Sequence, residues 1–273
     1  MTKHLPTQTK QQRRALATFD TSAISAVQAF VASLKHGGET LQGKRVIAVT
    51  AATARQFWQA GQTGSRFTFN RRTLQYLNGS TPVPRATVKA VAESAANEAR
   101  FKMMDAALRL QQGKLSPADF AIEHNAAVKN LVGAESALAR GGLAEMTAPD
   151  WERAEELTAK QYGYSRAFHE DIARGRYGVA GEDMGDAVLQ RTQLYANQGR
   201  AIFENTQKDN ARDRLGHDRA MRVKGAVDSC PTCIAEGGVW RAIEDVVEIS
   251  DSECGANCHC VIVTSVEGNE FDS

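Results

Sequence analysis

Cysteine is absent from the first 229 residues of this 273-residue chain, and all five cysteines lie between Cys230 and Cys260. Long apolar runs are absent as well: there is no stretch of about 18 apolar residues, which excludes a helix that spans a membrane. The N-terminal stretch lacks the apolar core of a secretory signal peptide. We therefore expect a cytoplasmic protein that does not contact a membrane, in a compartment that keeps thiols reduced.

Catalytic motifs are missing too, since the chain contains no G-x-S-x-G, no H-E-x-x-H and no dinucleotide fingerprint. The stretch GETLQGK at 38–44 has the first part of a phosphate-binding loop, but Arg45 follows where a Ser or Thr is needed. His169, Glu170 and Asp171 are consecutive on a predicted helix, where neighbours point in different directions. They favour a solvated helix face. We expect no enzyme and no small-molecule substrate.

The overall composition is that of a folded globular protein, with 42% hydrophobic and 24% charged residues. The net charge is +1, but positive and negative charges are unevenly distributed along the chain. Residues 225–273 contain ten Asp or Glu and one Arg, a net of −9, so residues 1–224 carry about +10. This division indicates a basic body and an acidic C-terminal module.

Changes in composition and the Gly- and Pro-containing breaks along the chain predict four segments. They are a flexible basic arm (1–19), a region of uncertain fold (20–84), a helical body (85–220) and a Cys-rich β module (221–273). Within the second segment, residues 21–36 have a helical apolar pattern. Residues 45–58 fit either a strand or a helix. The stretch NGSTPVP at 78–84 indicates a break.

The clearest helix begins after Ser116, a capping residue followed by Pro117 at the first helical position, and ends at Gly141. Its apolar residues recur at helical spacing: Phe120, Ala127, Leu131, Ala134 and Leu138. Further helices are predicted over 85–110, over 150–174 with Asp150 as the cap, and over 181–215.

Short β-type runs follow the helices: MRVKGAV at 221–227, GVWRAI at 238–243 and CVIVTSV at 260–266. The expected fold class is therefore α+β, mainly α, with a helical body followed by a small C-terminal Cys-rich β module that is zinc-ribbon-like. We expect the body and the module to have separate cores.

The cysteine spacing is C-x2-C, then twenty residues, then C-x3-C-x-C. Two clusters of thiols separated by a hairpin-length insert favour a structural zinc site, since Zn²⁺ takes four ligands tetrahedrally and each turn can supply two. The candidate ligands are Cys230, Cys233, Cys254, Cys258 and Cys260, of which any four could serve. Disulfides are the second alternative and unligated thiols the third. His259 is a weaker candidate ligand than the cysteines.

A zinc ion held by four protein ligands has no open position for water, so such a site is structural. A zinc ribbon also suggests contact with nucleic acid. The charge argues against it here, because four thiolates around Zn²⁺ add −2 to a module that is already acidic and would repel phosphate.

Four stretches, taken in order, resemble the bacteriophage minor head proteins, also called the phage head morphogenesis family, which includes the Mu F-like proteins. The stretches are LQQGKLSPADFAIEHNAAVKNLVGAESALARGG, RTQLYANQGRAIFENTQ, RVKGAVDSCPTCIAEGGVWRAI and CGANCHCVIV. The resemblance covers about residues 100–265. Many members have His-Pro before the final cysteines, where this chain has Cys254 and Gly255.

The resemblance implies a structural protein in the virion or procapsid interior, present in the host cytoplasm during assembly. Its implied partners are phage portal and/or capsid proteins, in head assembly, DNA packaging or DNA delivery near the portal vertex. The basic arm and body suit weak, non-specific contact with packaged DNA. The main alternative is a zinc-containing DNA-binding regulator. A further alternative is an enzyme whose site lies in the N-terminal part.

Overall fold

The computed structural model describes residues 40–41, 44–45, 51–225 and 229–267. The described chain is mainly helical with small antiparallel sheets, and a cysteine cluster lies near its C-terminal end, which confirms the expected α+β, mainly α class. The predicted arm (1–19) and the predicted helix over 21–36 lie outside the described residues. So does most of the phosphate-loop-like stretch.

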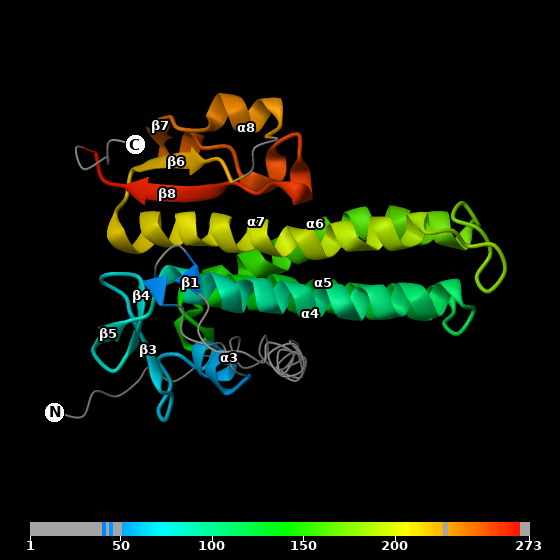
Figure 1. Cartoon of the computed structure of the whole chain (residues 1–273), viewed down its shortest axis with the longest axis horizontal. Coiled ribbons are helices and arrows are strands. Elements are labelled where there is room, and N and C mark those ends of the chain that lie inside the picture. The colour runs from blue at the N-terminus through cyan, green and yellow to red at the C-terminus, as the bar shows by residue number, and fades with distance from the viewer. Residues whose placement is uncertain (1–39, 42–43, 46–50, 226–228, 268–273) are drawn as a thin grey trace.

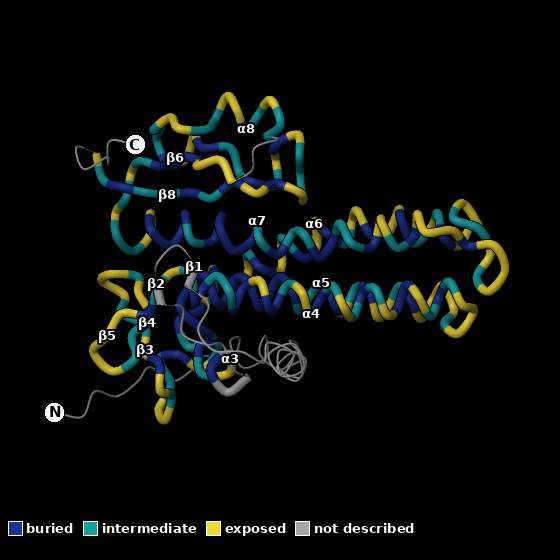
Figure 2. The backbone as a smooth tube through the Cα atoms, viewed as in Figure 1, coloured by how far each residue is buried: buried dark blue, intermediate teal, exposed yellow. Residues whose placement is uncertain are grey.

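Four long helices lie side by side along the longest axis of the molecule (Figure 1). They are α4 (Arg85–Gln111), α5 (Pro117–Arg140), α6 (Ala148–Ala173) and α7 (Ala187–Leu215). Helices α4, α5 and α7 contact one another, and α6 packs on α5. Their facing sides are buried while much of the outer surface is exposed (Figure 2). The bundle is held by an apolar cluster drawn from all four helices.

Helix α5 follows its local sequence signals. The Ser116 hydroxyl accepts a hydrogen bond from the Asp119 N–H at 3.1 Å, and Pro117 occupies the first turn. The five apolar residues predicted at helical spacing are all buried. Gly141 ends the helix at φ 105°, a left-handed conformation that costs glycine little. A Cβ there would lie 2.4 Å from the ring of Phe69, so glycine also permits this packing.

The starts of α6 and α7 differ from the predictions. Thr147, and not Asp150, caps α6: Asp150 is the third helical residue and forms a capping box with Thr147. Helix α7 begins at Ala187 after the capping residue Asp186, later than the predicted Gly181, which has φ 80° in the preceding turn. Both segments are rich in capping residues and glycine, and local pattern alone did not choose among them.

The region of uncertain fold contains short helix α3 (Ala51–Trp58) and a sheet of strands β3 (Phe67–Asn70), β4 (Gln75–Asn78) and β5 (Thr81–Pro82) in the order β3-β4-β5. Two-residue strands β1 (Thr40–Leu41) and β2 (Lys44–Arg45) pair with each other. The rings of Phe57 and Phe67 stack at 4.4 Å. The hydroxyl of Tyr76 donates to the Leu138 carbonyl at 2.9 Å, which fixes the sheet to α5.

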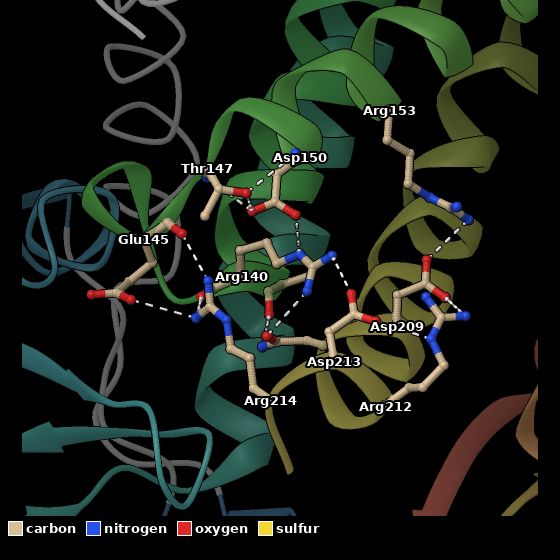
Figure 3. A network of polar contacts seen from close by, with 11 residues as sticks. Arg140, Glu145, Thr147, Asp150, Arg153, Asp209, Arg212, Asp213 and Arg214 are labelled. Carbon is tan, nitrogen blue, oxygen red and sulfur yellow. Dashed lines mark hydrogen bonds and ion pairs between the residues drawn. The ribbon is translucent and has the colours of Figure 1, made fainter. Parts of the chain in front are cut away.

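A buried ion network joins the ends of three helices (Figure 3). Arg140 of α5 pairs with Asp150 of α6 at 2.7 Å and with Asp213 of α7 at 3.2 Å. Arg214 donates to the Glu145 carbonyl at 2.8 Å. Because removing one partner would strand a buried charge, these contacts specify how α5, α6 and α7 meet.

The C-terminal module is a three-stranded antiparallel sheet with one short helix. Its strands are β6 (Arg219–Val223), β7 (Trp240–Ala242) and β8 (Val261–Ser265) in the order β7-β6-β8, and its helix is α8 (Pro231–Glu236). Three 3₁₀ turns complete it: η2 (Ile243–Asp245), η3 (Ile249–Asp251) and η4 (Gly255–Asn257). The three predicted β-type runs thus all contribute strands.

The module packs directly on α7, which contacts η3, η4 and β8 (Figure 1). Its apolar cluster includes Ala201 of α7 as well as Ile243, Ile249 and Ile262. The carboxylate of Glu204, buried in α7, accepts a hydrogen bond from the Ile262 N–H at 3.3 Å. The module thus has an apolar cluster distinct from those of the helical body, but Ala201 of α7 belongs to it, so the two parts meet at one face of α7.

Candidate metal centre

Two local turns present the five cysteines. Cys230 is the N-cap of α8 and Cys233 lies in the first turn of that helix, with Pro231 between them fixing the helical start. On the other side of the site, Cys254 and Cys258 bracket the 3₁₀ turn η4. Cys260 immediately precedes β8. The spacing within each pair is thus set locally, whereas the approach of the two turns depends on the sheet.

The sulfur atoms form two overlapping groups. Those of Cys230, Cys233 and Cys254 lie within 4.8 Å of one another, and so do those of Cys233, Cys258 and Cys260. Cys233 belongs to both groups, with its Sγ 3.5 Å from Cys254 Sγ and 3.6 Å from Cys258 Sγ. Tetrahedral coordination with metal–sulfur bonds of about 2.3 Å places sulfurs about 3.8 Å apart. The clustered thiols can therefore hold a metal ion.

The disulfide alternative is not the state of this structure, in which all five cysteines are free thiols. Bonded sulfurs would lie about 2.05 Å apart, much closer than the contacts observed. Cys233, Cys258 and Cys260 are buried, while Cys230 and Cys254 are half-buried. The cluster sits inside the apolar core of the module, next to Ile243 and Ile249.

Arg222 of β6 is a functional candidate that the sequence analysis did not identify. Its side chain is fully buried, and its Nη2 lies 3.1 Å from Cys258 Sγ and 3.4 Å from Cys233 Sγ. Within the described part of the chain, no carboxylate lies at ion-pair distance from this guanidinium. A buried cation requires a compensating negative charge, and the thiolates are the groups placed to supply it.

A sequence signal for Arg222 did exist. In a strand, alternate residues face the same side, so Ala220 and Arg222 share the face that covers the cysteines while Met221 faces away. An arginine at a core-facing strand position is unusual without a partner. Burial lowers the pKa of Arg222, but the facing Cys258, Cys233 and Cys260 outweigh this effect and raise it.

The thiol pKa values diverge across the cluster. A hydrogen bond from the Cys233 backbone lowers the pKa of Cys230 to about 7. Burial opposes ionisation of Cys258, yet hydrogen bonds led by that from the Cys260 backbone lower its pKa to about 7. Burial raises the pKa of both Cys233 and Cys254. Four neighbouring thiolates can therefore exist together only with a compensating cation, which a metal ion supplies.

His259 lies apart from both sulfur groups. Its side chain is exposed, and its Nδ1 lies 3.2 Å from a guanidinium nitrogen of Arg200. It therefore serves as a surface contact to α7. The sequence prediction of the five cysteines as the candidate set, with His259 weaker, matches the groups that the fold brings together.

The predicted solvated face of α6 is only partly solvated. Glu170 and Asp171 pair with Arg174 and Arg176, as exposed helix residues do. His169 instead turns inward, with its Nε2 3.2 Å from Nδ1 of the buried His124. Burial lowers the pKa of His124 to about 3 and that of His169 to about 4, so both rings are neutral. Aromatic rings surround the pair, which makes it part of the bundle core.

Comparison of the chain with protein-family models, with curated proteins and with solved structures finds no match in any of the three. Among the helices that the structure describes, none combines the length and apolar character needed to cross a membrane.

Proposed function

We propose that this chain is a structural minor head protein of a bacteriophage, with no enzymatic activity, whose C-terminal module is held together by one zinc ion. The proposal is supported by where the four stretches that resemble this family lie in the fold. They form α5 and the central part of α7, and in the cysteine module they form α8, β7 and η4 with parts of β6 and β8. These elements pack on one another, so the resemblance follows one continuous structural unit.

Zinc is the metal that best suits the cysteine cluster. Reduced thiolates are soft ligands, and a closed set of four at tetrahedral spacing is the usual environment of structural zinc. Iron–sulfur clusters also take cysteine ligands, but thiolates on different irons lie well apart, whereas Cys233 Sγ lies 3.5 and 3.6 Å from two other sulfurs, as around one metal ion. The ion would tie the turn at α8 to the turn at η4, with Arg222 reducing the net negative charge.

The division of charge suggests a division of roles. The basic residues of 1–224 would make weak, non-specific contact with packaged DNA, while the acidic module would be repelled by phosphate and free to dock on portal or capsid protein. Two exposed apolar side chains of the module, Ile234 and Val239, are available for such docking. The protein would then reside in the virion or procapsid interior, after assembly in the host cytoplasm.

The alternative of a zinc-containing DNA-binding regulator predicts tight binding to a defined sequence. Without a base-reading element, we expect weak binding that is independent of sequence and falls at least tenfold between about 50 and 200 mM salt. Fluorescence anisotropy with two unrelated DNA duplexes at both salt concentrations distinguishes the regulator from the head protein. Tight binding to one duplex at physiological salt would establish the regulator instead.

The head assignment is tested by quantitative mass spectrometry of purified virions and procapsids from the phage that encodes this chain. We expect the chain in both particles. The docking role is tested with Ile234→Asp, a surface change that should lower its copy number. Ile122→Asp, at an equally exposed position of α5, is the matched control. Particles that contain none of the wild-type chain would refute the proposal.

A further inference from the structure

A cavity of about 540 Å³ lies where three parts of the fold meet, well within the range of small-molecule pockets. One wall comes from strands β3 and β4 and the start of α4. The second comes from the C-terminal half of α7, and the third from the sheet of the cysteine module. The cavity is separate from the cysteine cluster.

The two facing walls are apolar. Met221 pairs with Trp240 on one side and Val263 on the other, so all three side chains project from the same face of the sheet. That face lines the cavity, opposite Tyr76 and Leu74 of the hairpin. The opposite face of the sheet covers the cysteines. The two faces of one sheet thus serve two different sites.

The charges that line the cavity are all positive. Arg85 and Lys208 contribute to its wall, and none of the described residues that line it is an Asp or Glu. Arg85 is already engaged, because it pairs with Glu204 at 3.4 Å and donates to the Ile262 carbonyl. Lys208 is different: its side chain is 6% exposed overall, and its ammonium, which is not among the fully buried unpartnered atoms, makes no ion pair or hydrogen bond to any described residue. The stem of Lys208 is thus held in the wall while its ammonium remains unpaired beside the cavity, where it can attract an anion that enters.

We propose that this cavity binds an amphipathic monocarboxylic acid. The carboxylate would pair with the Lys208 ammonium, and the hydrocarbon body would lie between the module's sheet and the hairpin. A carboxylate matches the single unpaired cation in charge. A phosphate would bring a second charge and more oxygens than this apolar lining can satisfy.

This site would hold whether or not the chain is a phage head protein, so it goes beyond the proposed function. Nothing in the sequence pattern indicates it, because its walls come from residues far apart in the chain. A ligand there would touch the N-terminal hairpin, α7 and the C-terminal module together. It would therefore stabilise the contact between these parts by mass action.

The test is isothermal titration calorimetry of the full chain with three probes of equal chain length: octanoate, octan-1-ol and octyl phosphate. We expect octanoate to bind about 10- to 100-fold more tightly than octan-1-ol, the range of one hydrogen bond to a charged group. Lys208→Met keeps the aliphatic stem and should bring the two affinities within about twofold, by loss of octanoate affinity. Lys114→Met removes an exposed lysine and is the matched control.

A second variant separates loss of the site from loss of folding. Ala211 lines the cavity and is 4% exposed, so Ala211→Leu should fill part of the space and weaken octanoate and octan-1-ol alike. Circular dichroism confirms that each variant is folded. The proposal is overturned if octanoate binds no more tightly than octan-1-ol, if Lys208→Met keeps the preference, or if octyl phosphate binds best.

Discussion

Gly199 of α7 lies directly against Glu135 of α5: a Cβ at position 199 would be 3.3 Å from Oε1 of Glu135 and 2.8 Å from Cδ1 of Leu131. Glu135 is fully buried, and among the residues that the structure describes neither of its carboxyl oxygens has a hydrogen-bond partner. Burial, and then the charge of Glu93, raise its pKa well above the usual value, which favours the protonated carboxyl. The missing side chain at Gly199 makes room for this buried carboxyl between two helices.

Gly199→Ala should destabilise the protein by about 1–3 kcal/mol, because an added methyl overfills a packed helix contact. The control is Gly163→Ala in α6, where nothing lies within 4 Å of the added Cβ. That change should stabilise the protein by about 0.5–1 kcal/mol, through the lower entropy cost of alanine in a helix. Urea denaturation measures both, and equal effects of the two changes would contradict the packing argument.

The His124–His169 pair predicts acid sensitivity. The pKa of His124 is lowered by burial, and then by the nearby His169, to about 3. The unfolded chain therefore binds more protons than the folded chain below about pH 6.5, and stability falls as the pH falls towards 3. Between pH 6.5 and 4 the loss from His124 is about 3 kcal/mol, at 1.36 kcal/mol per pH unit.

Carboxylates also titrate in this range. The measurement is therefore the difference in the free energy of unfolding between the wild type and His124→Phe at each pH. Phenylalanine suits a site whose neighbours are the rings of Phe120, Phe168 and Tyr195. Urea denaturation at several pH values should show a shallower pH dependence for the variant. If stability depends on pH equally in both proteins, the buried imidazole is not the source of the acid sensitivity.

The two sulfur groups predict unequal roles for the cysteines. Native mass spectrometry should find one zinc per chain, lost to a chelator. Cys233→Ser should abolish binding, since Cys233 belongs to both groups. Cys254→Ser and Cys260→Ser should each retain zinc with reduced affinity, because each leaves one of the two sulfur groups intact. Loss of zinc in all three variants alike would show that the site has no spare ligand.

Zinc removal should also affect the helical body. The module and α7 share a core through Ala201, and Glu204 of α7 binds the backbone of Ile262. Chelation should therefore lower the melting temperature of the whole chain, as followed by the helical circular dichroism signal, and not only that of the module.

Arg222 should support zinc binding by offsetting the thiolate charge. We expect Arg222→Met to lower zinc affinity about 10- to 100-fold, the usual effect of losing a partner of the metal ligands. Arg241→Met is the control, since Arg241 is another arginine of the module's sheet but pairs with Glu236. Competition with a chromophoric chelator gives both affinities. An unchanged affinity in Arg222→Met would assign this arginine to folding alone.

The sequence predicted local structure correctly where all the residues responsible for it lie within one turn of the chain. Ser116 and Pro117 start α5, and Gly141 ends it, because capping and left-handed backbone involve neighbouring residues only. The same holds for the pairing of Cys230 with Cys233 across the start of α8. Where several capping residues follow one another, as before α6, the local pattern misplaced the first residue.

The sequence by itself determined the mainly helical class, the clearest helix, the charge division and the candidate thiols, since each follows from composition or short-range spacing. Only the tertiary structure decided that Cys233 lies between two sulfur groups, that Arg222 is buried against them, and that α7 completes the module's core. It alone placed Lys208 in an apolar cavity. These features join residues distant in the chain, and such contacts depend on how helices and sheet pack, which no short window of sequence encodes.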